Sequence, residues 1–279
     1  MGSPREPLPN FERPPVVEVV LGVQFASPAA FATTHLGLLW SRFRESFPRV
    51  EQHPPTPTSL ARTDRSPKSG IRIEFAEPLI PRCWFIAEDG SQLIQVQPGL
   101  FTHNWRKTAA NPEYPRYPAL REQFRNELVQ LGDFLTAEGL GPLAITHCEV
   151  TYVNHIRSEH GTVWSGHGEA SKVFKFIGSP NALHYLPSAT SCGFRADYKM
   201  PMADGEGGLS VTMNPGIAAS TGEPMFNLTL SAQCSPRGSD LDSAMSMLDQ
   251  GREWVVRGFA DLTTDSMHQH WGRLDRVDD

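Results

Sequence analysis

The sequence has few cysteines, and none lies at a paired spacing. Four occur in 279 residues, with no CxxC pair: Cys83, Cys148, Cys192 and Cys234. Small disulfide scaffolds and zinc ribbons use denser or paired cysteines. We therefore expect reduced thiols in a cytoplasmic protein, with Cys148 buried as a small apolar side chain.

Long hydrophobic runs and an excess of positive charge are also missing. No apolar run approaches the roughly 20 residues that a transmembrane helix needs, and the first 15 residues lack the apolar core of a signal peptide. The formal net charge of −6 argues against bulk binding to nucleic acid or to an anionic membrane. The sequence therefore predicts neither a membrane nor a nucleic-acid partner.

One locally basic stretch is the exception to this charge balance. It comprises Arg62, Arg65, Lys68 and Arg72, with Arg82 beyond it and Trp84 and Trp105 further along the chain. Cations beside aromatic rings can contact phosphates and bases. In an acidic protein, a solvated basic loop is the favoured interpretation.

The familiar catalytic motifs are absent. The sequence contains no GxSxG, GxGxxG, GxxxxGK[ST] or HExxH motif and no kinase-like set. This lowers the case for an enzyme without closing it, and no cofactor is expected. His155, His160 and His167, with Glu159 and Glu169, offer ligand types that suit zinc or iron, but their spacing matches no compact metal motif, so no metal is expected.

Two stretches have a clear period of two. In the segment 143–156, LAITHCEVTYVNHI, apolar and polar side chains alternate between two faces, as in a half-buried strand. The segment 16–25, VVEVVLGVQF, has the same design. Superposing Glu18 on Glu149 aligns the two apolar faces, which suggests that each strand opens one copy of a repeated unit.

The order of the remaining landmarks repeats as well. Each opening strand is followed by a connecting segment, an Asp-Gly hairpin signal, a Pro-Gly turn and a long amphipathic helix, near 115–138 and 241–262. The expected fold is α+β, with two similar halves, each an antiparallel meander sheet packed on a long helix in a helix-grip-like pseudo-duplication. The alternative is a single α+β domain with two unrelated sheets. The expected boundaries are an extended arm at 1–15 and units at 16–141 and 142–279, packed as one body.

The polar face of the predicted sheets supplies most candidate binding residues. These are Glu18, Gln24, Arg72, Gln95, His147, Glu149, His155 and Arg195. Such a face can be a binding groove, an interface between the halves, or simply solvated, since antiparallel sheets often face water on one side. Glu18 and Glu149 could form an acid–base pair, although ion pairs with an arginine such as Arg72 or Arg195 are the favoured interpretation.

Several segments together resemble a family of uncharacterised bacterial proteins. They are the opening PPVVEVVLGVQF, the LLWSRFRESFP segment, NWRK after the Pro-Gly turn, and the closing FADLTTDSMHQHWGR. The family is sporadically distributed and typically lies near mobile-element or defence genes. The resemblance implies a cytoplasmic bacterial protein and brings no catalytic residue. It marks Trp105, Thr263, Thr264, His268 and Trp271 as candidates for a structural or partner surface.

Three functions follow as hypotheses. The first is a non-enzymatic interaction protein, such as a subunit of a defence or mobile-element system, with a protein partner or a second copy of itself. The second is a small-molecule-binding protein of helix-grip type, with its ligand between sheet and long helix. The third is a hydrolase that uses glutamate and histidine on the sheet face.

Overall fold

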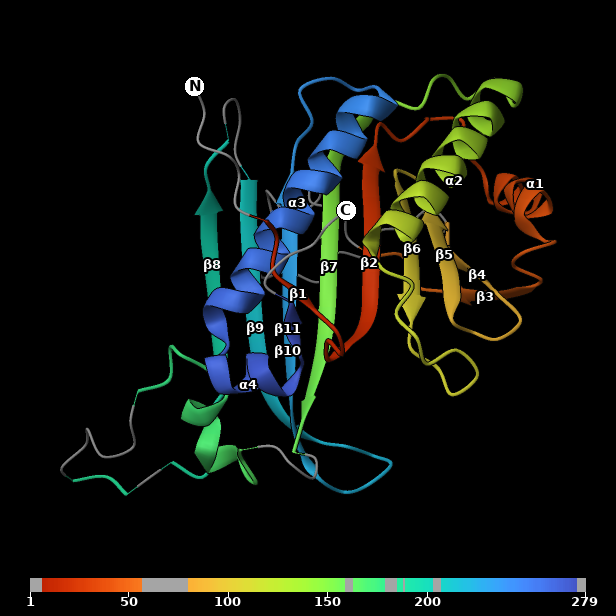
Figure 1. Cartoon of the computed structure of the whole chain (residues 1–279). Coiled ribbons are helices and arrows are strands. Elements are labelled where there is room, and N and C mark those ends of the chain that lie inside the picture. Colours follow the sequence, from red (N-terminus) through yellow and green to blue (C-terminus); the bar gives the residue numbers. More distant parts are fainter. Residues whose placement is uncertain are drawn as a thin grey trace, which may run out of the picture. The chain divides into compact units, whose positions relative to one another are not determined.

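The computed structural model describes residues 7–56, 80–158, 163–178, 185–187, 189–202 and 207–274. Within them the chain has an α+β fold with a large antiparallel sheet and a few helices (Figure 1). Two compact units are present. The N-terminal unit comprises residues 20–148 and 235–247, and the C-terminal unit comprises residues 1–19, 149–234 and 248–279. The division at residue 141 stays a prediction.

The N-terminal unit contains a meander of short antiparallel strands. Its strand order is β3 (Arg49–His53), β4 (Arg82–Ile86), β5 (Gln92–Gln97), β6 (Leu100–Arg106) and then β2 (Val16–Phe25), whose first four residues belong to the other unit. Gly90 and Gly99 have φ angles of 69° and 78°. Glycine adopts this left-handed region without a steric cost, which confirms the turns expected at Asp89-Gly90 and Pro98-Gly99.

Two helices complete this unit, α1 (Thr33–Phe43) and α2 (Tyr117–Ala137). The apolar stripe predicted for the second helix is buried along its whole length: Tyr117, Leu120, Phe124, Leu128, Leu131 and Leu135. Phe124 stacks on Phe101 of β6, with ring centroids 6.2 Å apart. Helix α2 therefore covers one face of the meander, as expected.

The C-terminal unit also contains antiparallel strands and a long helix. Strand β7 (Ile145–Arg157) is followed in the sheet by β10 (Pro224–Cys234), β9 (Gly207–Ile217) and β8 (Phe194–Met200). In β7 the alternate residues from Cys148 to Ile156 are buried and those from His147 to Arg157 are partly exposed, which confirms the predicted pattern. The 3-10 helix η2 (His167–Lys172) lies between β7 and β8 in the chain.

Helix α3 (Leu241–Leu262) covers the apolar face of the strands in the C-terminal unit (Figure 1). Its Gly251 permits a close approach, because a Cβ atom at this position would lie 3.2 Å from Cγ2 of Val150 and 3.4 Å from Cβ of Ala232. The predicted bounds of this helix, 241–262, are confirmed.

The two ends of the described chain meet in the C-terminal unit. Strand β1 (Asn10–Phe11) pairs antiparallel with β11 (Arg273–Leu274), beside helix α4 (Asp265–His270). The Phe11 ring contacts Phe259 and Trp271 at centroid distances of 5.6 and 6.0 Å. We call β1, α4 and β11 the terminal clip. The sequence offers Thr264 or Asp265 as the cap of α4; in the structure Oγ1 of Thr264 accepts a hydrogen bond from the Met267 amide and caps the helix.

Three local sequence patterns predict something other than what the structure shows. The polar, proline-rich composition of 51–70 predicts a loop, but residues 51–53 belong to β3, a polar edge strand that is defined by its pairing with β4 and not by its own pattern. The helical spacing of apolar residues after Leu36 predicts a helix that continues to Pro48, but α1 ends at Phe43. A short helix or strand is predicted at 172–177, but the 3-10 helix begins at His167 and ends at Lys172. The alternating pattern at 71–75 predicts a further strand, which lies outside the described residues.

Candidate ligand-binding cleft

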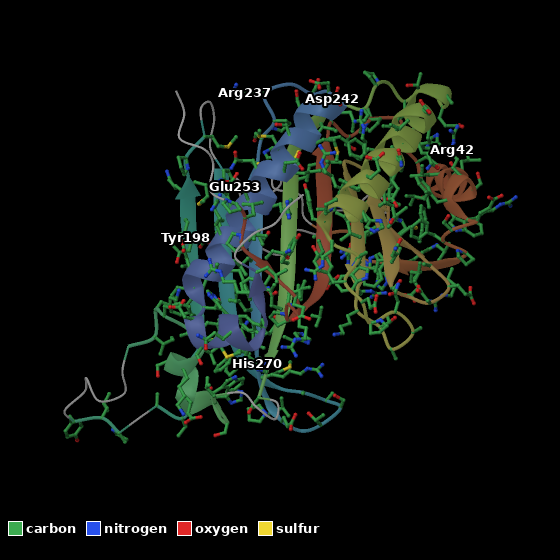
Figure 2. The ribbon with its side chains drawn as sticks, viewed as in Figure 1. Arg42, Tyr198, Arg237, Asp242, Glu253 and His270 are labelled. Carbon is green, nitrogen blue, oxygen red and sulfur yellow. The ribbon has the colours of Figure 1, made fainter. Side chains whose placement is uncertain are left out.

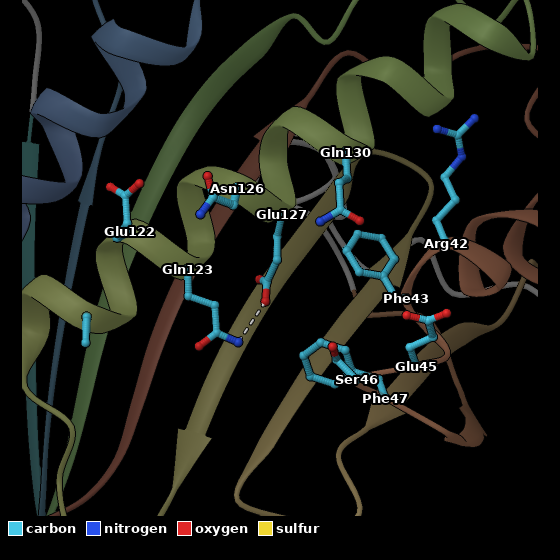
Figure 3. A pocket seen from close by; sticks show the side chains of 11 residues that line it. Arg42, Phe43, Glu45, Ser46, Phe47, Glu122, Gln123, Asn126, Glu127 and Gln130 are labelled. Atoms are coloured by element: carbon cyan, nitrogen blue, oxygen red, sulfur yellow. Dashed lines mark hydrogen bonds between the residues drawn. The ribbon is translucent and has the colours of Figure 1, made fainter.

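A cleft of about 530 Å³ opens between α1 and α2 in the N-terminal unit. Figure 3 shows its two walls, one from α2 and the other from the last turn of α1 and the residues after it. The lining residues are Arg42, Phe43, Glu45, Ser46, Phe47, Ala119, Glu122, Gln123, Asn126, Glu127 and Gln130. The volume lies within the range of roughly 300 to 1,000 Å³ that small-molecule sites occupy.

The wall from α1 is held rigidly by aromatic packing. Phe43 and Phe47 are buried, and the Phe43 ring lies 6.1 Å from the ring of Phe101 in β6. The indole nitrogen of Trp40 donates a hydrogen bond to the Phe47 carbonyl at 2.9 Å. This bond ties the chain after α1 back to the helix and so fixes the position of the aromatic wall.

A buried imidazole–carboxylate pair lies beneath the other wall. Nδ1 of His103 in β6 is 3.0 Å from both carboxylate oxygens of Glu127 in α2. His103 is 0% exposed and Glu127 is 4% exposed. Because an ionised carboxylate only accepts hydrogen bonds, Nδ1 carries the proton that joins the pair. Glu127 also lines the cleft, so the pair connects the core with the cleft.

Two glutamines extend this pair into a network. The amide nitrogen of Gln123 donates to Oε1 of Glu127 at 3.2 Å and to Oε1 of Gln92 at 2.6 Å. In Figure 3 the Gln123 and Glu127 side chains point toward one another. Groups from β5, β6 and α2 therefore fix the Glu127 carboxylate in one orientation, and such second-layer support is what pre-organises a binding group.

The second imidazole nitrogen of the pair is buried without a partner. Among the described residues, Nε2 of His103 makes no hydrogen bond, and the ring meets Phe47 edge-on at 6.4 Å. An unsatisfied buried polar atom costs about 1 to 3 kcal/mol. Functional sites are where such a cost is commonly retained.

The charge of the cleft is predominantly negative. Three carboxylates line it, from Glu45, Glu122 and Glu127, against the single guanidinium of Arg42. The Arg42 guanidinium lies over the Phe134 ring, 5.6 Å from its centroid. The lining therefore repels anions and favours groups that carry N–H donors or a positive charge.

The binding residues that the sequence predicted in the N-terminal unit lie outside the cleft. Gln95 accepts a hydrogen bond from Arg82 at 3.1 Å and donates to Asn104 at 2.9 Å. Trp105 is fully buried against Tyr114, with centroids 5.3 Å apart. The Gln24 carbonyl accepts a hydrogen bond from the Thr146 hydroxyl at 3.2 Å, and this hydroxyl also lies 3.1 Å from Nδ1 of His147. Arg72 lies outside the described residues.

In the C-terminal unit, the polar sheet face gathers some of the predicted residues. Glu149 accepts hydrogen bonds from Thr151 at 2.8 Å, Ser231 at 3.1 Å and Gln233 at 3.4 Å. Hydroxyl and amide donors thus surround this carboxylate, whereas Arg195 lies 3.6 Å from Asp197. Glu18 is partly exposed in β2.

The half-buried His155 belongs to the same face of β7 as Glu149. Its pKa is lowered from the usual value of 6.5, first by burial and second by the positive charge of Arg157. Both effects favour the neutral imidazole near pH 7. His155 therefore adds hydrogen-bonding capacity to this face without adding positive charge.

His268 and Trp271 lie inside the terminal clip. His268 is 2% exposed and Trp271 is 5% exposed. The Trp271 ring packs 5.1 Å from Phe259, which confirms that it anchors the last helix. Burial of both side chains, and of Trp105, favours the structural alternative for these residues over a partner surface.

Sequence reasoning missed the buried imidazole–carboxylate pair of His103 and Glu127, although the sequence contained a signal for it. Glu127 is spaced three residues after Phe124, on the buried stripe of α2, and His103 alternates with Phe101 and Trp105 on the inward face of β6. A polar, ionisable side chain on each of two apolar faces predicts a buried hydrogen-bonded pair. What the sequence could not show is that the two faces meet.

In the described parts of the chain, no cluster of three histidine, cysteine or acidic side chains could hold a metal ion; Glu159 and His160 lie outside those parts. None of the described helices has the length and apolarity to cross a bilayer. Comparisons with family models, curated proteins and solved structures found no match to the chain.

Proposed function

We propose that this protein is a non-enzymatic binding protein whose cleft between α1 and α2 holds a small polar ligand that is neutral or positively charged. The observation that carries the proposal is the Glu127 carboxylate, which lines the cleft while His103 and Gln123 hold it from below. A buried, oriented acceptor is suited to an N–H donor of a ligand. The aromatic wall of Phe43 and Phe47 suits a flat or apolar part of the same molecule.

The remaining lining residues support binding more than catalysis. Gln123, Asn126 and Gln130 recur along one side of α2 and present amide groups to the cleft. Among the described lining residues the hydroxyl nucleophile is Ser46, which is exposed and has no histidine in the lining beside it. An activated nucleophile needs a base within hydrogen-bond reach. The cleft offers recognition groups without that arrangement.

Thermal-shift screening tests this proposal. A ligand at 100 times its Kd stabilises the folded state by about 2.7 kcal/mol, which raises Tm by several degrees for a chain of this size. We expect amines, amidines and neutral amide-bearing heterocycles to raise Tm, and phosphates and carboxylates to have no effect. A panel in which only anions raise Tm would contradict the charge argument.

A matched pair of variants assigns any response to the cleft. Gln130→Lys places a long cation in the cleft, whereas Val129→Lys introduces lysine at the preceding residue of α2, which is 45% exposed and does not line the cleft. We expect Gln130→Lys to abolish the ligand-induced shift and Val129→Lys to retain it. Equal responses of the two variants would place the ligand elsewhere.

The helix-grip arrangement and the internal duplication are part of this proposal. The order strand, helix, meander, long helix occurs as β2, α1, β3 to β6, α2 and again as β7, η2, β8 to β10, α3. In each copy the opening strand lies beside the last strand of the meander, β2 beside β6 and β7 beside β10. Alignment of related sequences, half against half, tests the duplication: Glu18 should align with Glu149.

A second proposal rests on the sequence resemblance alone. Membership of the sporadic bacterial family would make the chain a subunit of a defence or mobile-element system with a protein partner. Co-purification with the product of a neighbouring gene tests it. Recovery of the chain without that product would count against the subunit proposal and would leave the cleft proposal intact.

A further inference from the structure

The outer edge of the C-terminal unit is formed by strand β8, residues Phe194–Met200. Within the described parts of the chain, β8 pairs with β9 on one side and no strand follows it on the other. The backbone N–H and C=O groups of alternate residues therefore point away from the sheet. Such an edge is a template for another strand unless something blunts it. Figure 2 shows Tyr198 at this edge of the C-terminal unit.

The side chains of β8 divide into two distinct faces. Arg195 and Asp197 lie on the polar face, with side chains 72% and 59% exposed. Phe194, Ala196 and Tyr198 lie on the opposite face, and Tyr198 is 43% exposed. The strand contains no proline, and its charges are of both signs. A single sign of charge would repel a second copy, and this mixture does not.

We propose that β8 pairs antiparallel with β8 of a second copy of this chain, about a two-fold axis at Ala196. In this register Arg195 faces Asp197 of the second copy and Asp197 faces its Arg195, so two opposite-charge pairs form on the polar face. On the other face Phe194 meets Tyr198 of the second copy, twice. Pairs of opposite charge and pairs of aromatic rings stabilise antiparallel strands when the two side chains lie directly across from one another.

The other edge strand of the described chain fits such pairing less well. Strand β3 has five residues, two fewer than β8, so it offers a shorter edge for pairing. The dimer is therefore assigned to β8, and two copies of the C-terminal unit would share one continuous sheet.

Charge reversal tests the proposed register. Sedimentation velocity from micromolar to near-millimolar protein should show the wild type changing from 30.9 kDa monomer to dimer. Arg195→Asp and Asp197→Arg should each weaken dimerisation about tenfold, since each converts two attractions into repulsions. The double variant Arg195→Asp/Asp197→Arg should restore it. A wild type that stays monomeric, or a dimer that both single variants leave unchanged, overturns the proposal.

A cysteine at the axis provides an independent readout. Opposed residues of an antiparallel pair have Cα atoms about 4.5 to 5.5 Å apart, within the range that a disulfide spans. In a Cys192→Ser background, Ala196→Cys should form an intermolecular disulfide on mild oxidation. Lys199→Cys in the same background is the control, because its two copies would lie six residues apart along the ladder. Cross-linking of Lys199→Cys but not of Ala196→Cys would refute the register.

Discussion

Acid should destabilise the C-terminal unit through one histidine of the terminal clip. Oγ1 of Thr263 donates its proton to the Phe259 carbonyl at 2.7 Å, so it accepts from Nε2 of His268, 2.8 Å away. On the other side of the ring, Arg273 donates to Nδ1 at 3.0 Å. Both ring nitrogens are therefore satisfied by the neutral tautomer. A proton on Nδ1 would remove the acceptor for Arg273 and would be repelled by its guanidinium charge.

The size of the effect follows from the pKa. Burial, followed by the charges of Arg273 and Lys175, lowers the pKa of His268 to about 4, against a partial opposing effect of Asp265. The unfolded chain has an ordinary histidine pKa of about 6.5. Between these values the unfolded state binds the additional proton, so stability falls as the pH falls. The difference between these two pKa values corresponds to about 3 kcal/mol of stability, which is present in full above pH 6.5 and lost by about pH 4.

Urea unfolding of the wild type and of His268→Gln, measured from pH 7.5 to pH 4, tests this prediction. Carboxyl groups and His155 also titrate in this range, so the informative quantity is the difference between the two free energies of unfolding. We expect the variant to be less stable at pH 7.5 and its disadvantage to shrink by about 3 kcal/mol as the pH approaches 4. His270→Gln, two residues along the same helix, should retain the wild-type pH dependence. A pH-independent difference for His268→Gln would refute the reasoning.

Four further predictions concern single sites. Removal of one partner from the buried pair, as in His103→Leu, should cost about 3 to 5 kcal/mol in urea unfolding, and the double change His103→Leu/Glu127→Leu should cost much less. Thr264→Ala should cost about 1 kcal/mol because it removes the cap of α4. Gly99→Ala should lower the free energy of unfolding more than Gly139→Ala. Both residues have a positive φ, but of the two only a Cβ at position 99 would meet backbone, the Phe25 carbonyl oxygen at 3.2 Å. Equal losses of stability in the two variants would contradict this. Glu149→Gln keeps an acceptor for Thr151 and Ser231 and should leave folding and cleft binding unchanged; a hydrolytic activity that this variant loses would instead support the hydrolase alternative.

Much of the local architecture could be read from the sequence. The period-two patterns at 16–25 and 143–156 and the helical stripes of α2 and α3 became strands and helices at those positions. These patterns are informative because burial on one face of a strand or helix repeats at the period of its backbone. The Asp-Gly and Pro-Gly turns could be predicted equally well, since glycine accommodates a positive φ that few other residues adopt.

The sites depended on contacts between segments far apart in the chain. The strand character of β3 comes from its ladder with β4, and a polar edge strand has no hydrophobic alternation to reveal it. His103 and Glu127 each appear in the sequence as a polar residue on an apolar face, but only packing of α2 on β6 joins them. Likewise His268 has a lowered pKa because the clip buries the ring and brings the charges of Arg273 and Lys175 close to it. The sequence by itself determined which faces are apolar, because that is a property of local periodicity. Only the tertiary structure decided which polar groups those faces enclose, because partners are chosen by the approach of separate elements.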